Sequence, residues 1–454
     1  MSFEVVNPAT GEKVTEIPAW DAKQLETGLA AVAKASPGWR NTPMTERCAL
    51  MHTAAEVLRS NKDKYAAIIT EEMGKLINDA RNEVEKCAMV CDFYAEKGPA
   101  FLADEVIESD AGKSYVAYLP LGTVLAVMPW NFPLWQVFRF AAPALVAGNT
   151  GVLKHASNVP QCALLIEDVF KLAGFPENVF RSLMIRASQV KSVIEDSRVH
   201  AVTLTGSEPA GRQVAATAGS CLKKSVLELG GSDAFIVLED ADLDLTVQNA
   251  VVSRFLNTGQ SCIAAKRFIV VDAIAEDFVA RFKAGVEALK PGDPMDESST
   301  LAPMAREDLR DELHVQVADT LAAGAVAVTG CEAIDGPGAF YKASILDRVE
   351  PGMRAYHEEL FGPVAIVIHA RDEEDALRIA NDSPYGLGGS VWTQDSSRGE
   401  RLARQVESGC TFVNGMVKSD SRLPFGGIKN SGYGRELSEH GIREFTNAKT
   451  IWIK

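Results

Sequence analysis

One cysteine of the chain lies in an unusual setting for a buried thiol. Cys262 belongs to the segment NTGQSCIAAKR, residues 257–267, in which small and polar residues surround the thiol and two basic residues close the segment. A thiolate is a strong nucleophile, but an isolated cysteine is more often a small buried hydrophobic residue. The segment has neither the periodicity of a core helix nor the spacing of a metal site, so these residues alone leave both interpretations open.

Two other short segments carry polar groups that suit acyl chemistry. Glu228 lies in LELGG, residues 227–231, and Asn131 lies in PWNFP, residues 129–133. A carboxylate can act as a general base, and a side-chain amide can donate a hydrogen bond to a developing oxyanion. The alternatives are a charge at the end of a strand for Glu228 and a turn beside prolines for Asn131.

A third segment, TGSEPAG at residues 205–211, stands between an apolar run and a predicted helix. Its glycines allow close approach of another group to the backbone, and the free N–H groups at a helix start favour a phosphate. The spacing matches neither GxGxxG nor a Walker loop, because no Gly-Lys-Ser/Thr follows. A plain turn from strand to helix is therefore the alternative.

Composition and charge narrow the classes of partner. The net charge is −15 and the pI is about 5.1, which argues against nucleic acid and anionic membranes as partners. No secretory signal is visible at the N-terminus, and the eight cysteines form no CxxC pair, so we expect a cytoplasmic protein with reduced thiols. The segment HEELF begins like a zinc motif, but Phe361 replaces the second histidine, and we expect no metal site.

Strand and helix patterns alternate along most of the chain. Residues 3–17 are predicted to form a hairpin, and two helical stretches follow at 22–35 and 45–101, the second broken in places. From GTVLAVMPWN at residue 122, short apolar runs alternate with helices of about a dozen residues, and RFIVVD at residue 267 opens a second series of this kind. This order predicts α/β architecture with parallel sheets, which bind ligands beyond the carboxyl ends of their strands.

Taken together, the motifs resemble those of the aldehyde dehydrogenase superfamily over nearly the whole chain. The matching segments, in the order of the family, are PWNFP at 129–133, LK with Ser157 after the second strand, TGS at 205–207, LELGG at 227–231, NTGQSC at 257–262, EELFGPV at 358–364 and PFGGIKNSGYGRE at 424–436. Seven motifs in one order are far more specific than any single motif.

The resemblance implies a fold and a division into domains. We expect an α/β aldehyde dehydrogenase fold with a Rossmann-like cofactor domain at residues 1–105 and 121–231 and an α/β catalytic domain at 232–432. A β-rich oligomerisation arm at residues 106–120 and 433–454 completes it. A homodimer or homotetramer is the expected assembly.

The resemblance also gives the catalytic residues their roles. Cys262 would add to the aldehyde as nucleophile, Asn131 would stabilise the oxyanion with the Cys262 backbone N–H, and Glu228 would activate water to hydrolyse the thioester. Glu228 also argues against relatives that pass the acyl group to coenzyme A. A non-catalytic relative that serves as a binding or structural protein would lack Cys262 or Glu228, and both are present.

Ten residues are expected to bind the cofactor: Trp130, Lys154, Ser157, Gly206, Ser207, Glu208, Gly211, Leu229, Glu359 and Phe361. Ser157 stands where NAD-specific relatives have a glutamate that would repel a 2′-phosphate, and Lys154 offers a cation nearby. The sequence therefore predicts NADP as the favoured cofactor, with NAD as the other.

The substrate residues point to an aldehyde that carries a carboxylate. Arg139 replaces an aromatic residue common in the family, while Ser419 and Trp135 match the shorter bacterial succinate-semialdehyde dehydrogenases. Leu256 departs from the longer enzymes of that kind, which have an arginine there. The alternatives are glutarate semialdehyde or a neutral aliphatic aldehyde, and an Arg139 that only caps or salt-bridges its own helix.

Overall fold

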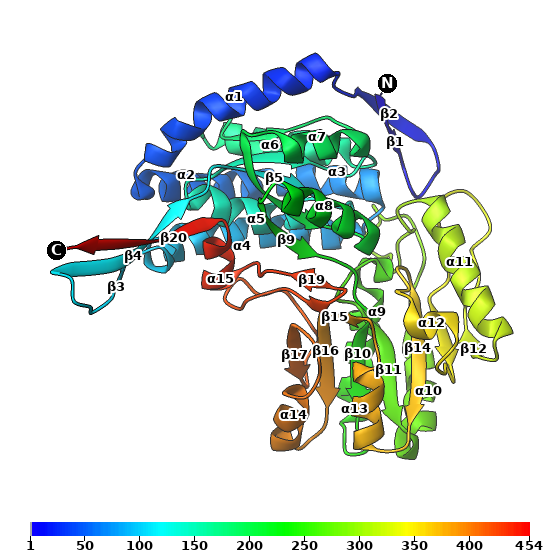
Figure 1. Ribbon diagram of the computed structural model, residues 1–454. Helices are drawn as coiled ribbons and strands as arrows, with labels where there is room; N and C mark the ends of the chain where they lie inside the picture. The colour runs from blue at the N-terminus through cyan, green and yellow to red at the C-terminus, as the bar shows by residue number, and fades with distance from the viewer. Residues whose placement is uncertain (1) are drawn as a thin grey trace.

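The computed structural model describes residues 2–454 as two sheet-based bodies and a projecting arm (Figure 1). An N-terminal hairpin, β1 (Ser2–Val6) with β2 (Lys13–Pro18), confirms the hairpin predicted from the sequence. The α/β architecture is confirmed as well, since both large sheets are mostly parallel and carry helices on both faces.

The first body is built on a six-stranded sheet. Its strands are, in spatial order, β19 (Gly432–Tyr433), β9 (Lys224–Glu228), β8 (Val199–Thr205), β5 (Thr123–Val127), β6 (Thr150–Lys154) and β7 (Phe180–Ser182). All neighbours are parallel except β19, which runs antiparallel to β9. The C-terminal segment thus returns to the edge of a sheet formed much earlier in the chain.

Helices cover both faces of this sheet. Along β5, Val124 packs in the cluster of one face and Leu125 in the cluster of the other, as expected for a central strand buried on both sides. One face carries α1 (Ala22–Asn41), α7 (Val190–Glu195) and α8 (Glu208–Ser220), and the short 3-10 helix η1 (Ala187–Gln189) precedes α7. The other face carries α5 (Trp135–Val146) and α6 (Pro160–Leu172). Outside these two helices lie α2 (Met44–Ser60), α3 (Lys62–Met73) and α4 (Ile77–Phe101).

Two helix predictions are refined by the structure. The helix predicted at 22–35 continues through Pro37 to Asn41, because buried Trp39 anchors its last turn and donates a hydrogen bond to the Leu145 carbonyl at 3.1 Å. The interrupted stretch 45–101 consists of α2, α3 and α4, and α3 ends at Gly74 in the left-handed conformation with φ 78°.

The second body is built on a seven-stranded sheet. Its spatial order is β12 (Val326–Thr329), β13 (Ser344–Asp347), β14 (Val364–Ala370), β11 (Ala265–Val271), β10 (Asp233–Val237), β16 (Gly388–Trp392) and β17 (Cys410–Val413), with only β12 antiparallel to its neighbour. One face carries α9 (Leu243–Phe255) and α10 (Asp272–Glu287); the other carries α11 (Glu307–Ala322), α12 (Arg354–His357), α13 (Glu373–Asn381) and α14 (Ser396–Ala403). The second α/β series is therefore confirmed, although α11, β12 and β13 were not predicted.

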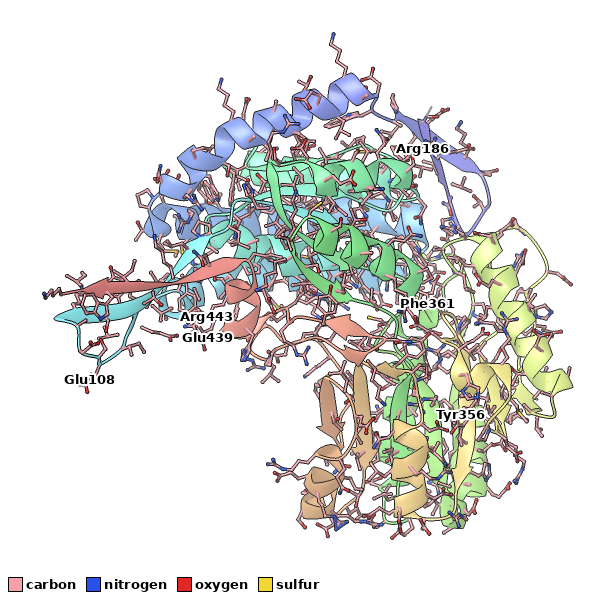
Figure 2. All side chains as sticks on the ribbon, viewed as in Figure 1. Glu108, Arg186, Tyr356, Phe361, Glu439 and Arg443 are labelled. Atoms are coloured by element: carbon pink, nitrogen blue, oxygen red, sulfur yellow. The ribbon has the colours of Figure 1, made fainter. Side chains whose placement is uncertain are left out.

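A three-stranded arm leaves the first body and ends at the C-terminus (Figure 1). It contains β20 (Thr446–Ile453), β4 (Lys113–Pro120) and β3 (Glu105–Val106), and α15 (Ser438–Glu444) leads into it. Near its base Arg443 pairs with Glu439 and Glu105 at 2.7 Å each (Figure 2). A short ladder of β15 (Tyr385–Gly386) and β18 (Ile428–Lys429) ties the C-terminal motif to the second body.

Strand direction places the predicted site residues together. Glu228, Thr205 and Lys154 are the last residues of three parallel strands of the first sheet, so they share its carboxyl edge. From that edge the chain crosses at residues 229–232 into β10, and Cys262 lies just before β11.

Candidate active site

The loop before Cys262 has a strained backbone that hydrogen bonds hold in place. In the 3-10 turn η2 (Leu256–Gly259), Asn257, Thr258 and Gly259 have φ values of 54°, 56° and 70°. This conformation is costly for a β-branched residue such as Thr258 and is found where the surroundings over-determine it. The Thr258 hydroxyl donates to the Ala302 carbonyl at 3.1 Å, and Asn257 Nδ2 donates to the Asn131 carbonyl at 2.9 Å. The loop is therefore fixed to the PWNFP segment.

A buried lysine holds the carbonyl groups on either side of the thiol. Lys266 Nζ donates to the Ser261 carbonyl at 2.8 Å and to the Cys262 carbonyl at 2.9 Å. It also lies 3.2 Å from Glu359 Oε1, which accepts a hydrogen bond from the Gly231 N–H at 3.1 Å. The EELFGPV segment is thereby joined to the Cys262 loop and to the end of LELGG.

The thiol itself is half-buried, and burial raises the pKa of Cys262 to about 12. The positive charges of Arg139 and Lys266 oppose that rise, while Glu359 and Asp233 add to it. The thiol is thus protonated at neutral pH in this state, and a nearby cation or base would promote its ionisation.

The Asn131 side chain lies beside the Cys262 loop, as the predicted oxyanion role requires. It is buried, and Nδ2 donates one hydrogen bond to the Gln260 carbonyl at 3.1 Å. A primary amide has two N–H groups, so the second can serve another acceptor. The asparagine is therefore more than the turn residue that its prolines would favour.

Glu228 ends β9, and its enclosed carboxyl group has no hydrogen-bond partner among residues 2–454. Its exposed fraction is 2%, and its pKa is raised well above the usual value by burial and then by the Glu436 carboxylate, against the attraction of Arg139 and Arg435. Gly426 contributes the space, since a Cβ there would lie 2.7 Å from Glu228 Oε1. A buried, unpaired carboxyl group of this kind is typical of functional sites.

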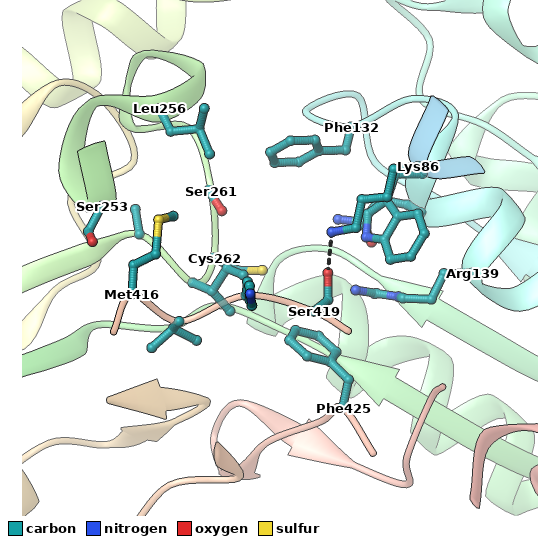
Figure 3. A pocket seen from close by; sticks show the side chains of 16 residues that line it. Lys86, Phe132, Arg139, Ser253, Leu256, Ser261, Cys262, Met416, Ser419 and Phe425 are labelled. Atoms are coloured by element: carbon teal, nitrogen blue, oxygen red, sulfur yellow. Dashed lines mark hydrogen bonds between the residues drawn. The ribbon is translucent and has the colours of Figure 1, made fainter. Parts of the chain in front are cut away.

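Two cavities meet at Cys262. One, of about 250 Å³, is lined by Cys262 together with residues of PWNFP, TGS, LELGG and EELFGPV. The other, of about 110 Å³, opens on the opposite side toward α4, α5 and the segment 416–425 (Figure 3). The thiol is thus accessible to two ligands that approach from different sides.

The larger cavity brings together most of the predicted cofactor residues. Trp130, Gly206, Ser207, Leu229, Glu359 and Phe361 all line it. The rings of Trp130 and Phe361 pack edge to face with centroids 5.8 Å apart, and Phe361 is visible near the junction of the two bodies (Figure 2). This cavity therefore has an aromatic wall and a carboxylate, Glu359, at one end.

The other four predicted cofactor residues lie outside the lining of that cavity. Lys154 is buried at the end of β6, burial lowers its pKa, and Ser157 is exposed just beyond it. Glu208 pairs with Arg212 at 2.6 Å on the surface of α8. Gly211 lets α8 approach the sheet, because a Cβ there would lie 2.5 Å from Leu229 Cδ2, so the structure gives it a packing role.

The smaller cavity contains the predicted substrate residues Arg139, Ser419 and Trp135 (Figure 3). The Arg139 guanidinium does not salt-bridge its own helix: it pairs with Glu436 of the C-terminal motif, and Nη2 donates to the Thr205 hydroxyl at 3.2 Å. Arg139 therefore borders the cavity while it neutralises a buried carboxylate.

Two residues of this site were missed in the sequence. Lys86 of α4 lines the cavity and donates to Ser419 Oγ at 2.7 Å, although no motif surrounds it. Glu436 stands within the quoted segment PFGGIKNSGYGRE, so its motif could have identified it, but only the fold shows that it faces Arg139. Within residues 2–454 no group of three His, Cys, Asp or Glu side chains could hold a metal, and no helix is long and apolar enough to cross a membrane.

Comparison with protein families gives a match over almost the full length. The family model described as the aldehyde dehydrogenase family matches residues 1–451. Among curated relatives, the chain is 50% identical over 447 residues to the Escherichia coli K12 protein named succinate semialdehyde dehydrogenase, NAD(P)+, covering 98% of this chain and 97% of that protein. It is 49% identical over 456 residues to the Mycobacterium leprae protein named succinate-semialdehyde dehydrogenase, NADP(+), with both chains fully covered.

A solved structure is similarly close. The crystal structure of succinic semialdehyde dehydrogenase from Streptococcus pyogenes in complex with NADP+ superposes with a TM-score of 0.98, at 40% sequence identity, and 99% of each chain is covered. The superposition therefore extends over both bodies and the arm.

Proposed function

Since the chain belongs to the aldehyde dehydrogenase family, we propose that it oxidises succinate semialdehyde to succinate, with NADP as the favoured cofactor and NAD as the other. The observation that carries the substrate is the composition of the smaller cavity. Its lining includes Lys86, Arg139 and Lys418 but no aspartate or glutamate, so an aldehyde with an anionic tail fits it better than a neutral one.

Cys262 would begin the reaction by losing its thiol proton to water and forming a bond from Sγ to the aldehyde carbon, while the carbonyl electron pair moves to oxygen. The free N–H of Asn131 and the Cys262 backbone N–H would donate to that alkoxide, and one such donor is worth about 3 kcal/mol at the transition state. The nicotinamide, when bound, supplies the acceptor for the hydride that leaves the carbon. Cys262 then carries a succinyl thioester.

Glu228 would complete the turnover as general base. Its raised pKa and lack of hydrogen-bond partners suit a group that accepts a proton from an attacking water molecule. Water adds to the thioester carbon, the C–S bond breaks, and succinate leaves with one water consumed. The space that Gly426 provides lets the carboxylate move toward the thioester.

The residues of the larger cavity fit a dinucleotide. Lys154 and Ser157 lie beyond the lining of this cavity. Lys154 is buried, and its ammonium group has no hydrogen bond or ion pair in the described part of the chain, so a ligand oxygen would suit it as a partner. Ser157 lies next to it and carries no negative charge, which leaves room for the 2′-phosphate of NADP. Glu359 and Ser207 would bind hydroxyl and phosphate oxygens along the cavity.

The arm supports a homodimer or homotetramer. Apolar side chains at its two outer strands, β3 and β20, are exposed: Val106 by 75%, Ile107 by 50%, Trp452 by 51% and Ile453 by 48%. Exposed apolar residues at the edges of a sheet are typical of an interface.

Steady-state kinetics with succinate semialdehyde, glutarate semialdehyde, butyraldehyde and acetaldehyde, each with NADP and NAD, tests the proposal. We expect the highest kcat/KM for succinate semialdehyde with NADP. A higher kcat/KM for glutarate semialdehyde or butyraldehyde would identify that aldehyde as the preferred substrate. Absence of turnover with all four aldehydes would contradict an enzymatic function.

A further inference from the structure

A half-buried lysine from α4 faces the smaller cavity next to Cys262. Lys86 Nζ donates to Ser419 Oγ at 2.7 Å and lies 4.1 Å from the centroid of the Trp135 ring (Figure 3). No carboxylate of residues 2–454 lies within ion-pair distance of this ammonium group. A cation held only by a hydroxyl and an aromatic ring retains its charge for an incoming anion.

The packing of α4 against α5 fixes the position of Lys86. Glu83, one turn earlier on α4, accepts hydrogen bonds from the backbone N–H groups of Leu134 at 2.8 Å and Trp135 at 3.0 Å. These are N–H groups at the start of α5 that have no partner within the helix. The contact fixes the start of α5 against α4, and therefore fixes Trp135 beneath the ammonium group of Lys86.

Arg139, the other cation that borders this side of the thiol, is already engaged. Its guanidinium pairs with buried Glu436 and donates to Thr205, and its charge also lowers the pKa values of Glu228 and Glu436 against the effect of burial. Arg139 thus offsets negative charge that belongs to the protein, whereas the charge of Lys86 is not offset.

We infer that Lys86 is the counter-ion of the distal carboxylate of the substrate, with Ser419 as the second donor, an assignment that rests on the proposed function. Because Ser419 Oγ accepts from Lys86, its own O–H remains free to donate. The ammonium and the hydroxyl together offer two donors to one carboxylate in the cavity that Cys262 also lines. Arg139 supports the site mainly by keeping Glu436 and Glu228 in place.

Titration distinguishes Lys86 from Arg139. Burial, and after it the charge of Arg139, lower the pKa of Lys86 to about 8, while Cys87, Glu83 and Asp420 oppose the shift. As the pH rises through this value the ammonium loses its proton and carboxylate recognition is lost, whereas a guanidinium stays charged. Recognition by Lys86 must therefore weaken in mildly alkaline solution.

The experiment measures the ratio of kcat/KM for succinate semialdehyde to kcat/KM for butyraldehyde, which has the same chain length without the carboxylate. Ionisation of Cys262 affects both rates and cancels in the ratio. For the wild type we expect a high ratio at neutral pH that falls as the pH passes through about 8. Lys86→Met should lower the neutral-pH ratio roughly 10- to 100-fold, since the loss of a hydrogen bond to a charged group lowers affinity by about that factor. The ratio should also become independent of pH.

Two further variants complete the test. Lys86→Arg should restore much of the ratio and keep it high in alkaline solution, which a purely structural role of the side chain would not produce. Lys97→Met is the matched control: it removes an exposed lysine of the same helix α4 that lies outside the cavity lining, and it should change the ratio less than about twofold. Turnover of butyraldehyde by each variant shows that the protein is folded.

The outcomes separate the inference from the function on which it rests. A wild-type ratio near one would refute the proposed substrate itself. A high wild-type ratio that Lys86→Met leaves unchanged, that does not fall with pH, or that Lys97→Met lowers equally would overturn the assignment to Lys86 and leave the substrate in place.

Discussion

Replacement of Arg139 by methionine tests the electrostatic arrangement behind the active site. Arg139 is 2% exposed and Glu436 is 5% exposed, and the two form an ion pair. The Glu436 carboxylate in turn raises the pKa of Glu228. Methionine preserves much of the apolar stem but removes the guanidinium, so that two buried carboxyl groups lose the cation that they share.

The expected loss of stability follows from the burial of this pair. Removal of one partner of a buried ion pair costs about 3–5 kcal/mol, because the other charge is left uncompensated. For a chain of 454 residues the entropy of unfolding is about 1 kcal/mol per kelvin, so the midpoint of thermal unfolding should fall by about 3–5 °C. Addition of Glu436→Gln should recover most of that loss.

The pH dependence has a definite sign. Burial already raises the pKa of Glu436, and loss of Arg139 must raise it further in the folded protein only. The folded state then binds a proton that the unfolded state releases, so stability decreases as the pH rises above the unfolded pKa of about 4.3. The destabilisation should be larger at about pH 8 than at about pH 5.

Thermal unfolding followed by circular dichroism provides the assay, with wild type, Arg139→Met, Glu436→Gln and the double variant compared at both pH values. If Arg139→Met were as stable as the wild type, or if the double variant were no more stable than Arg139→Met, the argument for a charge-compensating pair would be refuted. If Arg139→Met lost the same stability at both pH values, lost packing and not the charge of Glu436 would be the cause of the destabilisation.

Two other variants test the assignments around the cofactor and the nucleophile. Cys262→Ala should abolish dehydrogenase turnover and leave NADP binding, measured by calorimetry, nearly unchanged; more than a few per cent of the wild-type kcat would contradict the role of the thiol. Ser157→Glu should reverse the cofactor preference, because the new carboxylate can bind the ribose hydroxyls of NAD and repels the 2′-phosphate of NADP, whose charge is about −1.5 to −2. Unchanged KM for NADP in that variant would place Ser157 away from the 2′ position.

The sequence was sufficient for the fold and for the residues that lie in motifs. Alternation of apolar runs and helices predicted two parallel sheets, and the carboxyl ends of β8 and β9 then had to bring TGSEPAG and LELGG to one edge. The motif order favoured catalytic roles for Cys262, Glu228 and Asn131, which their local patterns had left open, and these roles stay predictions. Boundaries such as the end of α1 depended on tertiary contacts of Trp39 that no local pattern contains.

Side-chain contacts between residues far apart in the chain could not be predicted from the sequence. Lys86 resembles any other lysine of a long helix, and its contact with Ser419 joins residues that are 333 positions apart. The pairing of Arg139 with Glu436 likewise depends on the return of the C-terminal motif to the first sheet through β19. Charge recognition in the cavity is therefore a property of the folded chain, while the chemistry at Cys262 is visible in its motif.

In the proposed mechanism, oxidation proceeds through a thioester on Cys262 that Glu228 helps to hydrolyse. The most direct test is intact-protein mass spectrometry of Glu228→Gln, mixed with succinate semialdehyde and NADP and quenched in acid. We expect rapid formation of one NADPH per site and a mass increase equal to one succinyl group, located on the peptide that contains Cys262. Slow first-turnover formation of NADPH with no mass increase would contradict this mechanism, because Glu228 would then act before the thioester forms.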